Sequence, residues 1–324
     1  MTMLLALALL GAVSCQPAKT EGQSPPSASI QETNNAPTPA AAPAQTGPVG
    51  QAPKINAARA MQYTKEVTAF GARPIGSENH RKLENYIVSH LKGEEVESDS
   101  FTADTVEGKF PVRNIIAKLP GTKDGIIVIA GHYDTNYPLR DTKYVGANDG
   151  GSSTAILLEI ANQIRGKKRD GYSVWLVWTD AEEAMRKWSD ADSLYGTKHL
   201  AERWQKDGTA KKIKALLLAD MIGDADLNIE QETFSTPWLE DLIYQAASQL
   251  GYQSHFFGRK ISVDDDHLPF LKIGVPCADL IDLDYGYEDV FHHTPQDTMD
   301  KLSPKSLQIV GDVILQTVWM LDAR

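Results

Sequence analysis

The chain is poor in cysteine and in basic residues. Its 324 residues include only two cysteines, so a disulfide framework is excluded. We expect Cys277 to be a buried, inert thiol. Lysine and arginine number 32 against 43 aspartates and glutamates, and the formal net charge is −11. A chain of this charge offers no basic stripe for phosphate groups, which argues against nucleic acid or another polyanion as the partner.

No apolar run at the N-terminus is long enough for a membrane-spanning helix. Residues 1–14, MTMLLALALLGAVS, are apolar and end in small residues before Cys15, but a helical span needs about 20 residues. They predict an export signal over residues 1–15, and Ala-Val-Ser-Cys resembles a bacterial lipoprotein signal in which Cys15 is lipidated. An ordinary secretory signal is the alternative. We expect an exported protein of a bacterial cell envelope, periplasmic or held at a membrane only through Cys15.

Large apolar side chains are almost missing from residues 16–52, which are rich in Pro, Ala, Gln, Ser, Thr and Gly. Such a segment cannot bury enough surface to offset the entropy lost on ordering. We therefore predict a disordered linker over 16–52, followed by a single folded domain over 53–324. The length of that domain suffices for a substantial core.

Helical periodicity and apolar runs alternate through the predicted domain. Strand-like segments lie at 94–104, 110–118, 126–130, 174–178, 213–219 and 276–282, and helical ones at 56–70, 77–92, 152–165, 195–206, 236–250 and 303–321. The alternation predicts a single α/β domain with a mostly parallel, twisted central sheet and helices on both faces. Function in such sheets collects at the carboxyl ends of the strands.

Acids and histidines cluster at that predicted edge. Each cluster alone is weak evidence, because an aspartate in a glycine-rich turn usually serves the turn itself. Together they would repel one another, so a divalent cation is the simple compensator. Mixed histidine and carboxylate ligands suit zinc best. The clusters are GHYDT at 131–135, GANDGGS at 146–152, TDAEEA at 179–184, LLLADMIGD at 216–224, DDDHLPF at 264–270 and FHHTPQDT at 291–298.

The order of these clusters resembles the co-catalytic zinc aminopeptidase superfamily, and within it the glutaminyl cyclases (glutaminyl-peptide cyclotransferases). The deciding segments are EEAMRKWSDADSLYGTKHLA at 182–201, LLLADMIGDAD at 216–226 and DDHLPFLKIGVP at 265–276. Cyclases carry a very similar Trp-containing loop and a DDH segment, whereas ordinary aminopeptidases usually lack that loop. The resemblance covers roughly residues 55–322, and the match over 182–201 is highly specific.

The resemblance also implies roles for individual residues. Asp149, Glu183 and His293 would bind a single zinc ion, Glu182 would be the general acid/base, Asp220 and Asp265 would share a proton near the substrate amine, and Trp188 would wall the pocket.

Several positions depart from the pattern of the animal cyclases or stay open. His292 stands where those enzymes carry a pocket Trp, which implies a substrate-binding role, but either His292 or His293 could bind the metal. We choose His293 because Thr294 follows it, as in the family. Asp279 replaces a histidine. The roles of His132 and Asp134 are open, since that histidine binds a second zinc in aminopeptidases but is usually not a ligand in cyclases. We expect His267 to buttress Asp265 or the pocket loop, and Asp297 to cap a turn or orient His293.

The implied activity is the conversion of N-terminal glutamine of peptides or proteins to pyroglutamate with release of ammonia, by a zinc-dependent acyltransferase that we expect to be a monomer. A di-zinc aminopeptidase is the first alternative. An amine bound to a second zinc has its lone pair occupied and cannot be the nucleophile, so one zinc per chain favours the cyclase and two favour the peptidase. A catalytically inactive binding module is the second alternative, although every ligand position is filled by a competent residue.

Overall fold

The computed structural model describes residues 52–324. The predicted export signal, the lipidation of Cys15 and the linker up to residue 51 lie outside these residues and stay predictions. Ala52 is already packed against the domain, where its N–H donates a hydrogen bond to Gln316 Oε1 at 3.1 Å. The folded part therefore begins at least one residue before the predicted boundary at 53.

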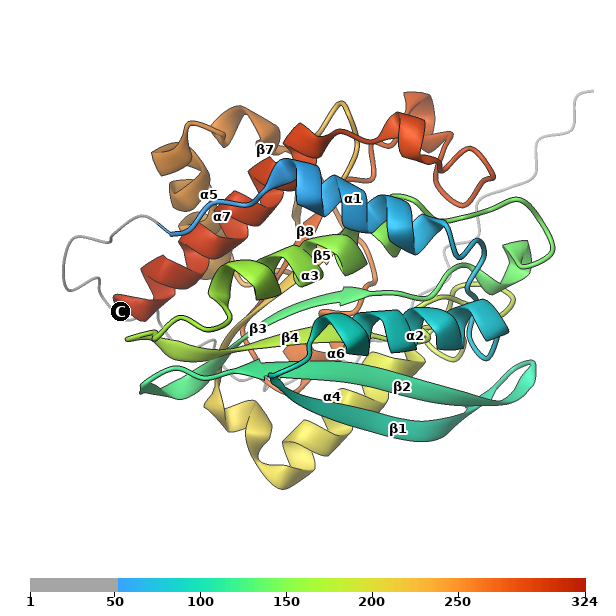
Figure 1. Ribbon diagram of the computed structural model, residues 1–324, viewed down its shortest axis with the longest axis horizontal. Coiled ribbons are helices and arrows are strands. Elements are labelled where there is room, and N and C mark those ends of the chain that lie inside the picture. The colour runs from blue at the N-terminus through green and yellow to red at the C-terminus, as the bar shows by residue number, and fades with distance from the viewer. Residues whose placement is uncertain (1–51) are drawn as a thin grey trace, which may run out of the picture. The chain divides into compact units, whose positions relative to one another are not determined.

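A six-stranded sheet forms the centre of the domain, with the strand order β1-β2-β4-β3-β5-β8 (Figure 1). Strands β4, β3, β5 and β8 run parallel to one another, whereas β2 is antiparallel to both of its neighbours, β1 and β4. The prediction of a mostly parallel sheet is therefore confirmed. The strands are β1 (Glu95–Thr105), β2 (Gly108–Leu119), β3 (Lys123–His132), β4 (Tyr172–Thr179), β5 (Ile213–Asp220) and β8 (Cys277–Ile281).

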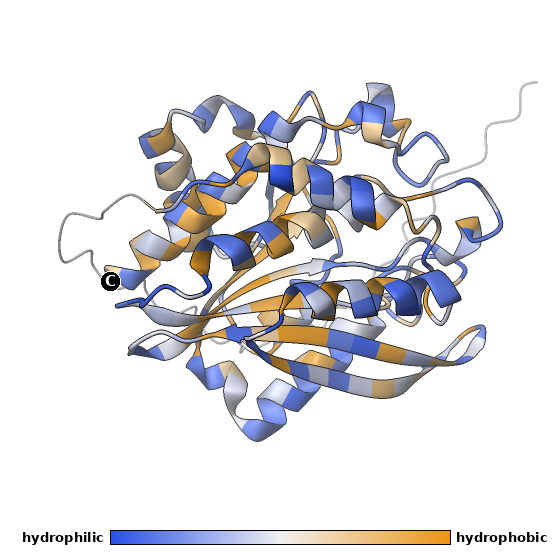
Figure 2. Cartoon of the chain, viewed as in Figure 1, coloured by the Kyte–Doolittle hydropathy of each residue, from blue (hydrophilic) through white to orange (hydrophobic). Residues whose placement is uncertain are grey.

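Helices cover both faces of the sheet, as predicted, and each face has its own apolar core (Figures 1 and 2). Strand β3 shows why its sequence is apolar throughout. Ile127 and Ile129 point into one core, while Val128 and Ala130 point into the other, as the two-residue period of a strand requires. The first core packs against α1 (Ala57–Thr68), α2 (Glu78–His90), α3 (Gly151–Ile164), α5 (Pro237–Leu250) and α7 (Pro304–Asp322), and the second against α4 (Tyr195–Asp207) and α6 (Leu268–Lys272).

Three short elements were not predicted from the sequence. Strands β6 (Ile229–Glu232) and β7 (Phe256–Ile261) form a separate parallel pair, and α6 has only five residues. The sequence of β6, IEQE, does not alternate apolar and polar residues, so it carries no strand pattern. Its two glutamates are nevertheless buried, because Glu230 pairs with Arg259 and Glu232 pairs with His267. Among residues 52–324, no helix combines the length and the apolar character needed to cross a membrane.

A buried ion pair joins α2 to the end of β4. His80 Nε2 lies 2.6 Å from Asp180 Oδ1, and its Nδ1 lies 3.2 Å from Glu84 Oε1. Although burial opposes it, these two carboxylates raise the pKa of His80 to about 10. Because this pKa exceeds the unfolded value of about 6.5, the stabilisation is complete below pH 6.5 and is lost as the pH rises through 10.

A His80→Gln variant should therefore lose less stability than the wild type as the pH rises toward 10. We expect the variant to be about 3–5 kcal/mol less stable at pH 7, because Asp180 is left buried without its partner. The deficit should shrink between pH 7 and pH 10. Urea unfolding of both proteins at a series of pH values measures this, and a deficit that stays constant with pH would contradict it.

Candidate active site

The carboxyl ends of the parallel strands bring the predicted clusters to one edge of the sheet. His132 is the last residue of β3 and pairs in register with Thr179, the last residue of β4. The adjacent glutamates Glu182 and Glu183 lie in the turn that follows Thr179. Asp220 ends β5 at the level of Ile281 in β8. A cavity of about 540 Å³ opens at this edge. It is lined by all eight residues predicted for the site, namely Asp149, Glu182, Glu183, Trp188, Asp220, Asp265, His292 and His293.

Three of these residues form a candidate metal centre. His293 Nε2 lies 3.1 Å from Glu183 Oε1 and 3.4 Å from Asp149 Oδ2. Ligands about 2.0–2.1 Å from a tetrahedral zinc ion lie about 3.3 Å from one another, so the donor set and its spacing fit zinc. Asn136 Nδ2 donates to Glu183 Oε2 at 2.9 Å, and the Tyr144 hydroxyl donates to Asp149 Oδ2. Such partners orient metal ligands.

The charges of this centre also suit a cation. Burial would raise the pKa of Asp149, but hydrogen bonds from His132 and His293 hold that pKa well below its usual value. Burial would lower the pKa of His293, yet Glu183 and Asp149 raise it to about 11. The carboxylates of Glu183 and Asp149 therefore stabilise a positive charge on the His293 imidazole. A divalent ion bound to this imidazole can take the place of its proton.

A second group of possible ligands lies beside the first. His132 Nε2 lies 3.1 Å from Asp149 Oδ1 and 3.2 Å from Asp220 Oδ1, and the ligand atoms of these three buried residues fall within 4.8 Å of one another. His132 Nδ1 has no hydrogen-bond partner, its closest carboxylate being Asp134 at 3.6 Å. The arrangement leaves both expectations for His132, ligand or not, geometrically possible.

Asp134 has a different part, which the sequence left open. Its two carboxylate oxygens accept the backbone N–H groups of Glu182 at 3.2 Å and Glu183 at 3.4 Å. These bonds fix the turn after β4, in which Ala181 has a φ of 54°. Strained backbone of this kind persists only where the surroundings hold it. Asp134 therefore positions the glutamate pair.

The Glu182 carboxylate accepts no hydrogen bond from residues 52–324. It is 6% exposed, and its closest ionic neighbour is His132 Nδ1 at 3.9 Å. Burial raises the pKa of the Glu182 carboxyl well above its usual value, and the nearby charges of Glu183 and Asp265 act in the same direction. An acid with a raised pKa and no fixed partner is suited to exchanging protons with a bound molecule.

The predicted hydrogen bond between Asp220 and Asp265 is not formed in this structure. Asp220 instead contacts His132, while Asp265 Oδ1 accepts the Asp266 N–H at 2.5 Å and its Oδ2 has no partner. The two aspartates are still close enough that, after burial, Asp220 is the main cause raising the pKa of Asp265. Both residues line the cavity.

The two adjacent histidines lie differently, which bears on the choice between them. His292 Nδ1 is 3.0 Å from Asp289 Oδ2 in its own loop, whereas His293 Nε2 faces both Glu183 and Asp149. The two rings are adjacent, with centroids 4.0 Å apart, and the ligand atoms of Asp149, His292 and His293 lie within 4.8 Å of one another. The contacts of His293 with both Glu183 and Asp149 favour it as the ligand, and His292 lines the cavity with Trp188.

For two supporting residues the structure distinguishes between the expected roles. His267 does not hydrogen-bond Asp265; its Nε2 lies 3.0 Å from Glu232 Oε2 on β6, a strand that the sequence did not predict, and Glu232 also accepts the backbone N–H of Phe234, which lines the cavity. Asp297 does not orient His293. Its carboxylate accepts the backbone N–H groups of Asn148 and Asp149, at 2.8 and 3.2 Å, so it supports the other end of the metal centre.

Arg73 is the supporting residue that the sequence analysis missed most completely. Its buried guanidinium donates to the carbonyl oxygens of Tyr133, Val145 and Gly146, and so ties the loop before Asp149 to the end of β3. Gly150, with a φ of 71°, completes this loop, since a Cβ there would lie 2.5 Å from Asp134 O. The glycine-rich pattern pointed to this loop, but nothing in the sequence marks Arg73.

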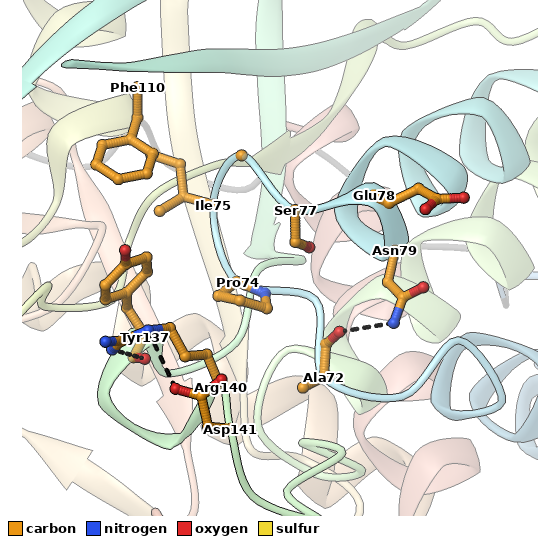
Figure 3. A pocket seen from close by; sticks show the side chains of 11 residues that line it. Ala72, Pro74, Ile75, Ser77, Glu78, Asn79, Phe110, Tyr137, Arg140 and Asp141 are labelled. Carbon is orange, nitrogen blue, oxygen red and sulfur yellow. Dashed lines mark hydrogen bonds and ion pairs between the residues drawn. The ribbon is translucent and has the colours of Figure 1, made fainter.

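A second cavity, of about 530 Å³, lies next to the start of α2 (Figure 3). Ile75, Phe110 and Tyr137 line one side, and Arg140 lies over the Tyr137 ring at 4.3 Å. None of the predicted site residues lines it, so we assign the chemistry to the first cavity.

Comparison with known proteins identifies the class first. The model of peptidase family M28 matches residues 114–318, and the chain belongs to this family. Within it, the chain is 30% identical over 252 residues to the glutaminyl-peptide cyclotransferase of Drosophila melanogaster, covering 69% of this chain and 70% of that protein. A crystal structure of an Acidobacteriales bacterium glutaminyl cyclase is 50% identical, with a TM-score of 0.83, covering 86% of this chain and 99% of that one.

A peptidase-like relative is more distant. A Zn-dependent exopeptidase from Parabacteroides distasonis is 25% identical, with a TM-score of 0.74, covering 83% of this chain and 99% of that one. The predicted resemblance to glutaminyl cyclases, within a zinc aminopeptidase-like family, is thus confirmed, and so is the fold class.

Proposed function

We propose that this protein is a glutaminyl-peptide cyclotransferase, which converts the N-terminal glutamine of peptides or proteins to pyroglutamate and releases ammonia. The observation that carries the proposal is the 50% identity to a glutaminyl cyclase over almost the whole of that chain. It is supported by a cavity lined by Glu182, whose carboxylate accepts no hydrogen bond from residues 52–324, and by Asp149, Glu183 and His293, a donor set that suits zinc.

The residues of the cavity can perform each step of the ring closure. Bound by Asp149, Glu183 and His293, zinc would supply a Lewis acid for the γ-carbonyl of glutamine. Glu182 removes a proton from the neutral α-amine as this nitrogen attacks the γ-carbonyl carbon to form a C–N bond. Glu182 returns the proton to the γ-nitrogen, the original C–N bond breaks and ammonia leaves. One group serves both transfers.

The remaining residues orient the substrate. Asp220 and Asp265 both line the cavity, and we assign them the orientation of the substrate amine. Trp188 is partly exposed on the wall of the cavity and offers a flat apolar surface to the glutamine side chain. A fixed amine close to the carbonyl carbon converts the reaction into an oriented intramolecular step.

A di-zinc aminopeptidase remains the competing hypothesis, because His132, Asp149 and Asp220 could hold a second ion. The decisive experiment incubates the purified protein with a short peptide that begins with glutamine and follows ammonia. We expect ammonia without release of free glutamine. Release of the N-terminal amino acid, from this peptide or from aminoacyl chromogenic substrates, would instead establish a peptidase.

A further inference from the structure

The edge of the sheet opposite the cavity has a charge that the composition hides. Strands β3, β4 and β5 begin at this edge, and α3 and α7 end there. The segments 123–124, 165–171, 211–214 and 322–324, which we call the basic face, together hold nine lysines and arginines and three aspartates. The whole chain has 32 basic against 43 acidic residues. Its net charge, from which we expected no basic surface, therefore conceals a local one.

Contacts between the four segments make the basic face one surface. Tyr172, the first residue of β4, has Lys123 Nζ 5.5 Å and Lys214 Nζ 5.8 Å from the centroid of its ring. Asp322, at the end of α7, pairs with Arg169 at 2.6 Å and accepts the Tyr172 N–H at 2.9 Å. The loop from α3 to β4 and the C-terminus therefore lie side by side (Figure 1).

Most of the lysines on this face are exposed and have no carboxylate partner among residues 52–324. The five exposed ones are Lys167, Lys168, Lys211, Lys212 and Lys214. Lysines on other surfaces, such as Lys82 and Lys109, form ion pairs with nearby carboxylates. An ammonium group without such a partner keeps its charge available to an external anion.

The composition of the face suits the headgroups of anionic lipids. Six of its nine basic residues are lysines, whose long stems let the charged group reach the headgroup layer. Clusters of about four to eight lysines and arginines attract anionic lipid surfaces in this way. Two partly exposed aromatic rings accompany them, Tyr172 and Trp319, and Arg169 lies over the Trp319 ring at 4.4 Å. Such amphipathic rings are enriched at membrane interfaces.

The cavity edge has the opposite charge. Six carboxylates line the cavity, and no lysine or arginine is among its lining residues. The strands between the two edges have 8 to 10 residues, so the edges are about 25–30 Å apart. This separation exceeds the distance of about 8–10 Å over which salt screens charges. An anionic surface would therefore attract the basic face without repelling the cavity, and would orient the molecule.

The described chain also begins near this face. Ala52 bonds to Gln316 on α7, about 9 Å along the helix from Asp322. An anchor upstream of Ala52, such as the predicted lipid on Cys15, would thus tether the domain close to its basic end. A lipid chain and a basic patch are the two signals that together give stable membrane binding.

We propose that the basic face docks on an anionic lipid surface, with the cavity directed away from the bilayer. The cavity then stays open to peptides in solution. This docking is separate from the chemistry of the cavity and does not depend on it.

Cosedimentation with lipid vesicles tests the docking. The full chain carrying Cys15→Ser, which has no lipidation site, is mixed with vesicles of phosphatidylcholine alone or with about one third phosphatidylglycerol. We expect binding to the anionic vesicles to be about tenfold tighter at about 0.05 M salt, and only about twofold tighter at about 0.5 M salt, where charges are screened. Binding through the apolar residues 1–14 would occur with both vesicles and would leave the ratio unchanged.

Two variants of equal net charge locate the effect. The first replaces four exposed lysines of the basic face, by Lys167→Gln, Lys168→Gln, Lys211→Gln and Lys212→Gln, and should reduce the tenfold ratio to about twofold. The control replaces four exposed lysines elsewhere, by Lys65→Gln, Lys109→Gln, Lys143→Gln and Lys260→Gln, and should keep the ratio. Thermal unfolding shows that both variants are folded. An equal loss in both, or no preference of the wild type for anionic vesicles, would overturn the proposal, and so would tighter binding to duplex DNA than to these vesicles.

A fluorescent label tests the orientation. Cys277 is buried, so in the Cys15→Ser chain an environment-sensitive dye reacts only at a cysteine introduced by Lys168→Cys or by Lys143→Cys. Lys168 lies on the basic face, and Lys143 lies in the exposed loop before Asp149. Anionic vesicles should change the emission of the dye at position 168 and leave that at position 143 unchanged. The reverse result would show that the cavity edge faces the membrane, which contradicts the proposal.

Discussion

Replacing Glu182 with glutamine should lower kcat for ammonia release by about 100- to 10,000-fold, the range for loss of a general acid/base. The amide keeps the size of the side chain but cannot take up the proton of the α-amine. KM should change little, because no residue in the described range 52–324 donates a hydrogen bond to this carboxylate. Steady-state kinetics measure both constants, and zinc content should match the wild type.

Two further substitutions separate catalysis from other effects. Glu240→Gln makes the same change at another buried glutamate, whose pKa burial raises to about 7 and which lies on α5 outside the cavity. It should keep wild-type activity. Glu183→Gln alters the adjacent glutamate and should lose zinc together with activity. If Glu182→Gln kept more than a tenth of the wild-type kcat, its assigned part in the proton transfers would be wrong.

The centre of the sheet could be predicted from the sequence because its central strands are apolar on both faces. A continuous apolar run such as Ile126 to Ala130 is typical of a central strand that is buried on both faces. The parallel order then puts the ends of β3, β4 and β5 side by side, so the clustering of His132, Glu182 and Asp220 followed from topology before any contact was known. The assignment of separate roles to them came from the resemblance to glutaminyl cyclases.

The supports of the site could not be predicted, because they depend on contacts between distant parts of the chain. Arg73 lies about 60 residues before the carbonyl of Tyr133 that it binds, and His267 finds Glu232 on a strand with no sequence pattern. Asp134 looked like a metal ligand or a loop residue, yet it accepts backbone N–H groups. Sequence spacing predicts which face a side chain occupies, whereas its partner depends on how the loops pack.

Zinc content provides the other large expected effect. We expect about one zinc per chain in the purified protein after dialysis, held by Asp149, Glu183 and His293. Replacement of His293 with alanine should then remove the zinc and the ammonia-releasing activity together. The expectation of a single ion follows from the chemistry, since an amine that coordinates a second zinc has no free lone pair for ring closure.

His132→Ala distinguishes one ion from two. His132 contacts Asp149 and Asp220 but neither Glu183 nor His293, so its removal should leave the zinc content near one per chain. In a di-zinc aminopeptidase, the wild type would contain about two zincs and this variant about one. Metal analysis of both proteins shows directly whether the wild type holds one zinc ion or two. Activity on a glutamine peptide, measured in parallel, shows whether the group of His132, Asp149 and Asp220 matters for ring closure. A loss of activity in His132→Ala without a loss of zinc would indicate that the imidazole holds Asp149 and Asp220 in place, through the two contacts of 3.1 and 3.2 Å.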